Sequence, residues 1–361
     1  MSANIADKID FIKSFLLKNS CVYDNNLIEK DMIDVLYELF KFDRFDEIII
    51  RNNPILVRYY ASYCKIKKDY VKAFELYQKA ASLGYSYAIT SLAICYEYGN
   101  GTGVDIKKAF KLYQKGADLN SSSAINNLGI CYENGNGTGV DKKKAFELYQ
   151  KAASLGNSYA INNLARCYEN GHGTGVDKKK AFELYQKAAN FDNSFAIYNL
   201  ARCYEDGIYT KKDLMRAFEL YQKASGFNNH YAVYKLARFY EKGMGIEKDE
   251  NKAFELYQKA IQLGNLLAIN NLADCYSKGI GCDIDMVEAI KLYKSNKDTS
   301  ESRLIEFTQK NSADVVELII KIDNENKELK KINEHLKLYP GTSYDQAMED
   351  FELAKNNKLY N

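Results

Sequence analysis

Small and hydrophobic residues recur along most of this chain in two alternating patterns. In the first pattern, Ala124, Leu128 and Tyr132 follow one another at intervals of four residues, which places them on one face of a helix. In the second pattern, Ala145 and Tyr149 have the same spacing. The two patterns predict two consecutive amphipathic helices, and the glycine-rich segment between them predicts a turn.

The pair of patterns repeats every 36 residues. The leucine of the first helix recurs at Leu92, Leu128, Leu164, Leu200, Leu236 and Leu272. The tyrosine of the second helix recurs at Tyr77, Tyr113, Tyr149, Tyr185, Tyr221, Tyr257 and Tyr293. Gly135 is expected to end the first helix, and Asp141 is a candidate N-cap of the second. Each unit is therefore predicted to be an antiparallel helical hairpin, and the chain an all-α solenoid.

The repeated unit resembles the Sel-one-like repeat, a relative of the tetratricopeptide repeat. The matching residues are Leu128-Gly129, Tyr132, Gly135-x-Gly137-x-Gly139-Val140-Asp141 and Lys144-Ala145-x3-Tyr149-x-Lys151-Ala152-Ala153-x2-Gly156. The resemblance implies a right-handed α–α superhelical solenoid. It also implies a role in protein binding, because proteins of this family commonly act as assembly or signalling adaptors. The fourth repeat departs from the pattern and has Tyr209 after Gly207-Ile208, so its turn is expected to differ.

The sequence divides into four parts. Residues 1–58 are expected to form an N-terminal helical cap, and residues 59–86 a degenerate tetratricopeptide-like repeat. Residues 87–294 hold six complete repeats, and residues 295–361 hold a linker followed by helix. Apolar residues recur every seven positions over 315–336, a pattern typical of either a capping helix or a short coiled coil that joins two chains.

Composition and charge exclude several classes of function. The 50 Lys and Arg residues balance 48 Asp and Glu residues, which offers no broad electrostatic surface for nucleic acid. No apolar run approaches the roughly 18 residues of a membrane span, and residues 1–10 do not resemble a signal peptide. We therefore expect a cytoplasmic protein with reduced cysteines, no nucleic-acid partner and no membrane insertion.

The candidate catalytic and metal-binding residues do not form recognisable sites. Five repeats have a cysteine at one position, but Phe239 occupies this position in another, so core packing is favoured over metal binding. The glycine runs lack the Gly-Lys-Ser/Thr of a phosphate-binding loop. The three histidines lie far apart in the sequence, and no nucleophile with a base is evident. The sequence predicts no catalytic residue, no metal and no cofactor.

A variable stripe on the first helices is the candidate binding surface. In the architecture that the resemblance implies, these helices line the inner, concave face. The stripe residues selected as partner-binding are Asn162, Arg166, Tyr198, Arg202, Tyr234 and Arg238. Arginine and tyrosine are enriched in protein-binding hot spots, and a guanidinium suits carboxylates, so the expected partner is a protein or peptide, with an acidic one favoured.

Other interpretations of these features remain open. Each of the three arginines has a glutamate three residues later, so the pairs could simply stabilise the helices. The sequence favours an adaptor that binds a protein or peptide along the concave face, because a preformed surface loses less entropy on binding. The alternative function is a structural homo-oligomer assembled through residues 315–336.

Overall fold

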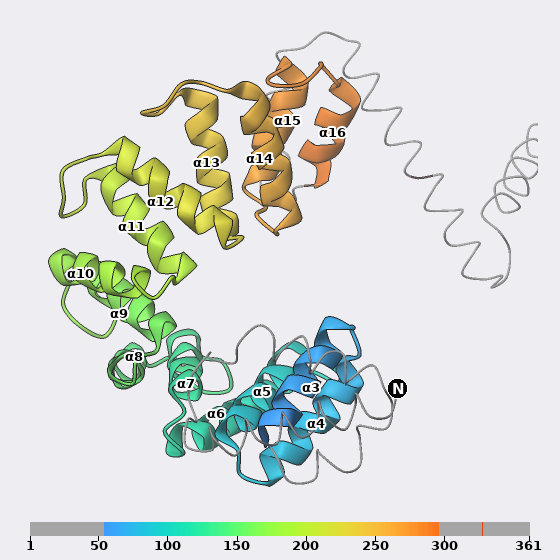
Figure 1. Cartoon of the computed structure of the whole chain (residues 1–361), viewed down its shortest axis with the longest axis vertical. Helices are drawn as coiled ribbons and strands as arrows, with labels where there is room; N and C mark the ends of the chain where they lie inside the picture. The colour runs from blue at the N-terminus through green and yellow to red at the C-terminus, as the bar shows by residue number, and fades with distance from the viewer. Residues whose placement is uncertain (1–53, 296–326, 328–361) are drawn as a thin grey trace, which may run out of the picture. The chain divides into compact units, whose positions relative to one another are not determined.

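The computed structural model describes residues 54–295 and Lys327 (Figure 1). Most of the predicted N-terminal cap, and the heptad segment 315–336 apart from Lys327, lie outside these residues. The described part is helical and has no strand. Its helices are α3 (Pro54–Ile66), α4 (Tyr70–Ser82), α5 (Ser86–Tyr98), α6 (Ile106–Asp118), α7 (Ser122–Asn134), α8 (Lys142–Ser154), α9 (Ser158–Asn170), α10 (Lys178–Ala189), α11 (Ser194–Asp206), α12 (Leu214–Gly226), α13 (His230–Lys242), α14 (Glu250–Gln262), α15 (Ala268–Lys278) and α16 (Met286–Ser295).

The chain divides into two compact units, Met1–Ala196 and Ile197–Asn361. In the first unit, α3 to α10 form four consecutive helical hairpins, and each hairpin packs on the next. In the second unit, α13 pairs with α14 and α15 pairs with α16, while α12 packs on α13. The predicted all-α architecture of repeated hairpins is confirmed.

Each hairpin is closed by capping interactions that the sequence predicts. Gly135 adopts the left-handed conformation with φ 78° after α7, and Asp141 accepts a 2.9 Å hydrogen bond from the backbone N–H of Lys144. The backbone N–H of Asp141 donates in turn to the carbonyl of Tyr132 at 2.8 Å. These bonds satisfy backbone groups that would otherwise be left open at the two helix ends.

The fourth turn keeps the backbone course of the others, contrary to the prediction that it differs. Tyr209 has a positive φ of 57°, where Gly137 has 73°. The N–H of Ile208 donates to the carbonyl of Cys203 at 2.9 Å, as the N–H of Asn136 does to Cys131 at 2.9 Å. The prediction failed because hydrogen bonds hold the turn even with a residue that disfavours this φ.

The core of each hairpin consists of the repeated tyrosine, leucine and small residues. Tyr149 is fully buried, and a Cβ atom on Gly129 would lie 2.7 Å from its ring, so glycine on the first helix of this hairpin lets the ring pack closely against α7. Cys131 and Cys167 are buried and free, and burial raises the pKa of each thiol to about 12. Phe239 fills the cysteine position of its repeat and is fully buried. The core interpretation of this position is confirmed.

Aromatic and cationic side chains pack around the tyrosine near the end of each first helix. The Lys144 ammonium lies 4.3 Å from the ring centroid of Tyr132, which is a cation–π contact. Phe110, from the preceding hairpin, meets the same ring edge-on at 5.5 Å. Within the described residues, no helix is long and apolar enough to span a membrane.

Candidate functional site

The six predicted stripe residues lie on the first helices of three successive repeats. Asn162 and Arg166 are on α9 in the first unit, whereas the two Tyr–Arg pairs are on α11 and α13 in the second. Asn162 is only 5% exposed, so this side chain lies beneath the surface and does not line it. The Arg166 side chain is 44% exposed, and the other four residues are partly exposed: Tyr198, Arg202, Tyr234 and Arg238.

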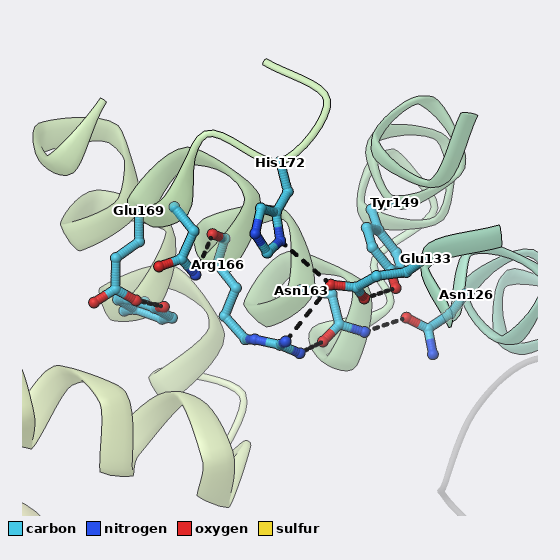
Figure 2. Close-up of polar contacts among 9 residues, drawn as sticks. Asn126, Glu133, Tyr149, Asn163, Arg166, Glu169 and His172 are labelled. Atoms are coloured by element: carbon cyan, nitrogen blue, oxygen red, sulfur yellow. Dashed lines mark hydrogen bonds and ion pairs between the residues drawn. The ribbon is translucent and has the colours of Figure 1, made fainter. Parts of the chain in front are cut away.

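A glutamate beside the stripe accepts a hydrogen bond from the buried tyrosine of its own hairpin. The Tyr149 hydroxyl donates to Glu133 Oε2 at 2.7 Å (Figure 2). The same bond recurs in the other described hairpins with this glutamate: Tyr113 to Glu97, Tyr185 to Glu169, Tyr221 to Glu205 and Tyr257 to Glu241. Burial is the main cause of the raised pKa of Tyr149, so its hydroxyl keeps the proton that it donates. The glutamates therefore hold the two helices of each hairpin together.

Arg166 pairs with the preceding repeat and not with its own. Its guanidinium lies 3.6 Å from Glu133 Oε1 and donates to Asn163 at 3.5 Å. Asn163 donates onward to Asn126 at 3.0 Å, so the contacts cross between α9 and α7 (Figure 2). The ion pair of Arg166 with Glu133 therefore joins two repeats, whereas the alternative interpretation of the sequence considered its pairing with Glu169 on the same helix.

His172 adds a third group to the surroundings of Glu133. The Nδ1 atom of His172 lies 3.7 Å from Glu133 Oε1, and Figure 2 shows it pointing toward this carboxylate. The Glu133 side chain is only 13% exposed. A tyrosine hydroxyl, a guanidinium and an imidazole thus converge on a carboxylate that is largely removed from water. This arrangement is suited to holding repeats together, and it leaves Arg166 less available to a partner.

The second unit distributes its charges differently. Lys235, and not an arginine, pairs with Glu205, at 2.9 and 3.0 Å from the two carboxylate oxygens. Arg202 donates to Asn199 at 3.4 Å. In the described part of the chain, the guanidinium of Arg238 has neither an ion pair nor a hydrogen bond. Lys235 pairs with Glu205, the glutamate that corresponds to the Glu133 partner of Arg166, so the arginine of this repeat does not take that carboxylate.

The tyrosines of the second unit are held by neighbouring rings. The Tyr198 ring lies 5.7 Å from Tyr221 and 5.6 Å from Tyr231. The Tyr234 ring lies 6.1 Å from Tyr257, and its hydroxyl donates to Asn271 at 3.4 Å. These contacts restrict the two stripe tyrosines, so they would lose little side-chain entropy on binding.

Asp274 at the end of the stripe has a structural role that sequence reasoning missed. In the last repeat, Ser277 stands where the other repeats have the glutamate that accepts from tyrosine. The Tyr293 hydroxyl donates instead to Asp274, one turn earlier on α15. The simultaneous loss of glutamate at 277 and gain of aspartate at 274 was a signal in the sequence that could have revealed this exchange.

These features define a class of protein, a helical repeat protein. The residues at buried positions are similar from one repeat to the next, whereas the residues on the surface of the first helices vary. A family model described as the Sel1 repeat matches residues 58–85, 86–121, 122–157, 158–190, 194–225, 230–265 and 266–295. The chain belongs to the Sel1 repeat family. Proteins of this family generally serve as protein-interaction scaffolds and are typically non-catalytic.

Solved structures agree with the family. A Sel1 repeat protein from Oxalobacter formigenes is 28% identical, with a TM-score of 0.58, over 66% of this chain and 97% of that one. The protective antigen c5321 of uropathogenic Escherichia coli, which displays the same repeat fold, is 24% identical with a TM-score of 0.51. That match covers 80% of this chain and 67% of the antigen, and it supports the fold alone. No curated protein sequence matches this chain.

Proposed function

We propose that this protein is a non-catalytic scaffold that binds a protein or peptide along the concave face formed by the first helices. The main contacts are assigned to Tyr198, Arg202, Tyr234 and Arg238 in the second unit. The observation that carries this assignment is the half-buried guanidinium of Arg238, which has no ion pair or hydrogen bond within the described residues. A permanently charged group in such a position is satisfied by a carboxylate from a partner.

Neighbouring tyrosines support the same assignment. Tyr234 lies one helical turn before Arg238 on α13, and Tyr198 has the same relation to Arg202 on α11. Rigid aromatic rings beside a guanidinium are typical of binding hot spots, because the rings add apolar contact while the cation selects an acidic group. In the first unit, Arg166 contributes less to binding and more to the contact between repeats, since Glu133 neutralises it.

A cytoplasmic location forms part of the proposal. Five cysteines of the described residues, Cys95, Cys131, Cys167, Cys275 and Cys282, are free, and all of them except Cys282 are buried. A chain with unpaired thiols at repeated core positions suits a reducing compartment, where such thiols are not oxidised.

The test is affinity capture from lysate of the native host, read by mass spectrometry. Wild type is compared with the double variant Arg202→Ala/Arg238→Ala. The matched control, Lys211→Ala/Lys212→Ala, also removes two positive charges, but from the loop between α11 and α12. Circular dichroism verifies that all three proteins are folded. Partners retained by the control and lost by the stripe variant support the proposal, whereas identical partner sets for all three proteins contradict it.

A further inference from the structure

The short turns between successive hairpins lie along one edge of each unit. In a series of antiparallel hairpins, every second connection lies at the same end, so the turns that join one hairpin to the next are neighbours. These turns follow α4, α6, α8 and α10 in the first unit, and α12 and α14 in the second. We call the residues from the last turn of one hairpin to the first turn of the next the turn edge. It shares no residue with the stripe that carries the proposed function, and it adjoins this stripe where the Tyr231 ring contacts Tyr198.

The turn edge exposes large apolar side chains in every turn. In the second unit, Leu266 and Leu267 stand side by side in the chain and are 63% and 61% exposed. The other large exposed apolar residues of the two turn edges are Leu83, Tyr87, Leu119, Leu155, Tyr159, Phe191, Phe195, Phe227 and Tyr231. Exposed apolar residues also recur on the opposite edge, as at Val104, Val140 and Val176. What distinguishes the turn edge of the second unit is the adjacent pair Leu266 and Leu267 together with Phe227 and Tyr231, a group of large exposed apolar side chains that indicates an interaction surface.

A lysine accompanies the apolar residues of every turn. These lysines are Lys79, Lys115, Lys151, Lys187, Lys223 and Lys259, all exposed and all in the last turn of a second helix. The acidic residues of the same segments are Asp118 and Asp192, both in the first unit. The second unit has two lysines and no acidic residue in these segments, 223–231 and 259–267.

The opposite edge of the hairpins differs from the turn edge in the second unit. Its loop 243–249 has two carboxylates and one lysine, and its loop 279–285 has two carboxylates and no lysine. The turn segments 223–231 and 259–267 of the same unit carry two lysines and no carboxylate. In the first unit the two edges are alike in charge, because lysines such as Lys142 and Lys178 also lie on the opposite edge.

We propose that the turn edge of the second unit binds the surface of an anionic lipid membrane. Leucine and aromatic side chains would enter the interfacial layer, where tyrosine and phenylalanine are stable, and the lysines would meet the negative headgroups. The apolar side chains protrude from two tight turns, and exposed polar residues such as Asn228 lie between them. Such protrusions suit a soft lipid interface better than a protein partner, which requires a continuous complementary surface.

The test is co-sedimentation of the full chain with vesicles of neutral phosphatidylcholine, with and without about 30% phosphatidylserine. One variant, Leu266→Ser/Leu267→Ser, removes apolar side chains. Its matched control is Val140→Ser/Val176→Ser, which changes two valines of 62% and 61% exposure on the opposite edge. A second variant, Lys223→Glu/Lys259→Glu, reverses the charge of the turn edge, and Lys211→Glu/Lys212→Glu is its control.

We expect wild type to bind the anionic vesicles and to bind neutral vesicles at least tenfold more weakly, by about 1.4 kcal/mol. Each turn-edge variant should bind about tenfold more weakly than wild type, while both controls bind as wild type does. Circular dichroism spectra equal to that of wild type establish that the variants are folded. Absence of binding by wild type, or equal losses in variants and controls, would overturn the proposal; in the first case, the turn edge is a surface for proteins.

Discussion

The hydrogen bond between the buried tyrosine and the glutamate of each hairpin should differ in strength from repeat to repeat. The Tyr113 hydroxyl donates to Glu97 at 2.6 Å, and the Tyr149 hydroxyl donates to Glu133 at 2.7 Å. Both tyrosines are fully buried in the first unit. Replacing each by phenylalanine removes the hydroxyl and keeps the ring, so packing is preserved and only the polar contact is lost.

The two substitutions differ in what remains around the carboxylate. Within the described residues, Glu97 accepts a hydrogen bond from Tyr113 and forms no ion pair, so the Tyr113→Phe variant leaves a half-buried carboxylate without a protein donor. Losing a hydrogen bond to a charged group in this way costs about 2–3 kcal/mol. Glu133 keeps Arg166 at 3.6 Å and His172 at 3.7 Å, so the Tyr149→Phe variant should lose only about 1 kcal/mol.

The assay is urea denaturation followed by circular dichroism, with both the midpoint and the slope of the transition fitted. The slope should be unchanged in both variants, because the same surface is exposed on unfolding. A transition in several steps is analysed at the step assigned to the first unit, since repeat proteins need not unfold as one unit. Equal losses for the two variants, or a larger loss for Tyr149→Phe, would refute the view that the neighbouring guanidinium and imidazole groups compensate for the hydroxyl.

Three further predictions concern the turns and the thiols. Gly173→Ala should lower the free energy of unfolding by about 2 kcal/mol or more, because φ is 73° and a Cβ would lie 2.2 Å from a backbone carbonyl oxygen. Gly175 has open space around it, so Gly175→Ala should be nearly neutral in the same urea assay. Tyr209→Gly should raise the free energy of unfolding by up to about 1 kcal/mol, since it relieves a positive φ of 57°. A lowered urea midpoint would contradict this prediction. Cys167 and Cys275, whose pKa values burial raises to about 12, should react with a disulfide reagent at pH 8 only after unfolding. Because unfolded thiols lose protons near pH 9.0 and the folded ones near 12, the free energy of unfolding should be constant below pH 9 and fall as the pH rises from there.

The sequence was sufficient to predict the hairpins, because their determinants are local. A residue such as Leu164 repeats at 36-residue intervals on a helical face, and it is buried as expected. Asp141 and Gly135 mark helix ends through backbone chemistry that depends only on a few neighbouring residues. The turn around Tyr209 was the exception, because its hydrogen bonds outweigh the conformational preference of one residue.

The stripe was less accessible to prediction, because its contacts join residues in different hairpins. Spacing along one helix suggests that Arg166 meets Glu169, three residues away. The structure joins Arg166 to Glu133, 33 residues earlier, because Glu133 lies on the neighbouring first helix. Both Glu133 and Glu169 accept a hydrogen bond from the tyrosine of their own hairpin, so this bond does not decide between them. The packing of the helices determines which of two carboxylates pairs with an arginine, and helical periodicity does not predict that packing.

The charged residues of the first helices have different roles because only some of them pair with a glutamate of the preceding hairpin. Where a repeat supplies a cation that reaches the preceding glutamate, as Arg166 and Lys235 do, the charge serves the contact between hairpins. Where the glutamate is already paired with Lys235, the arginine on the same helix, Arg238, keeps its charge for another ligand. A lysine at 235 in place of the asparagine found at 163 is therefore the change that makes Arg238 available. Lys235→Asn should turn Arg238 toward Glu205 and weaken partner binding as strongly as Arg238→Ala does, although the arginine itself is still present.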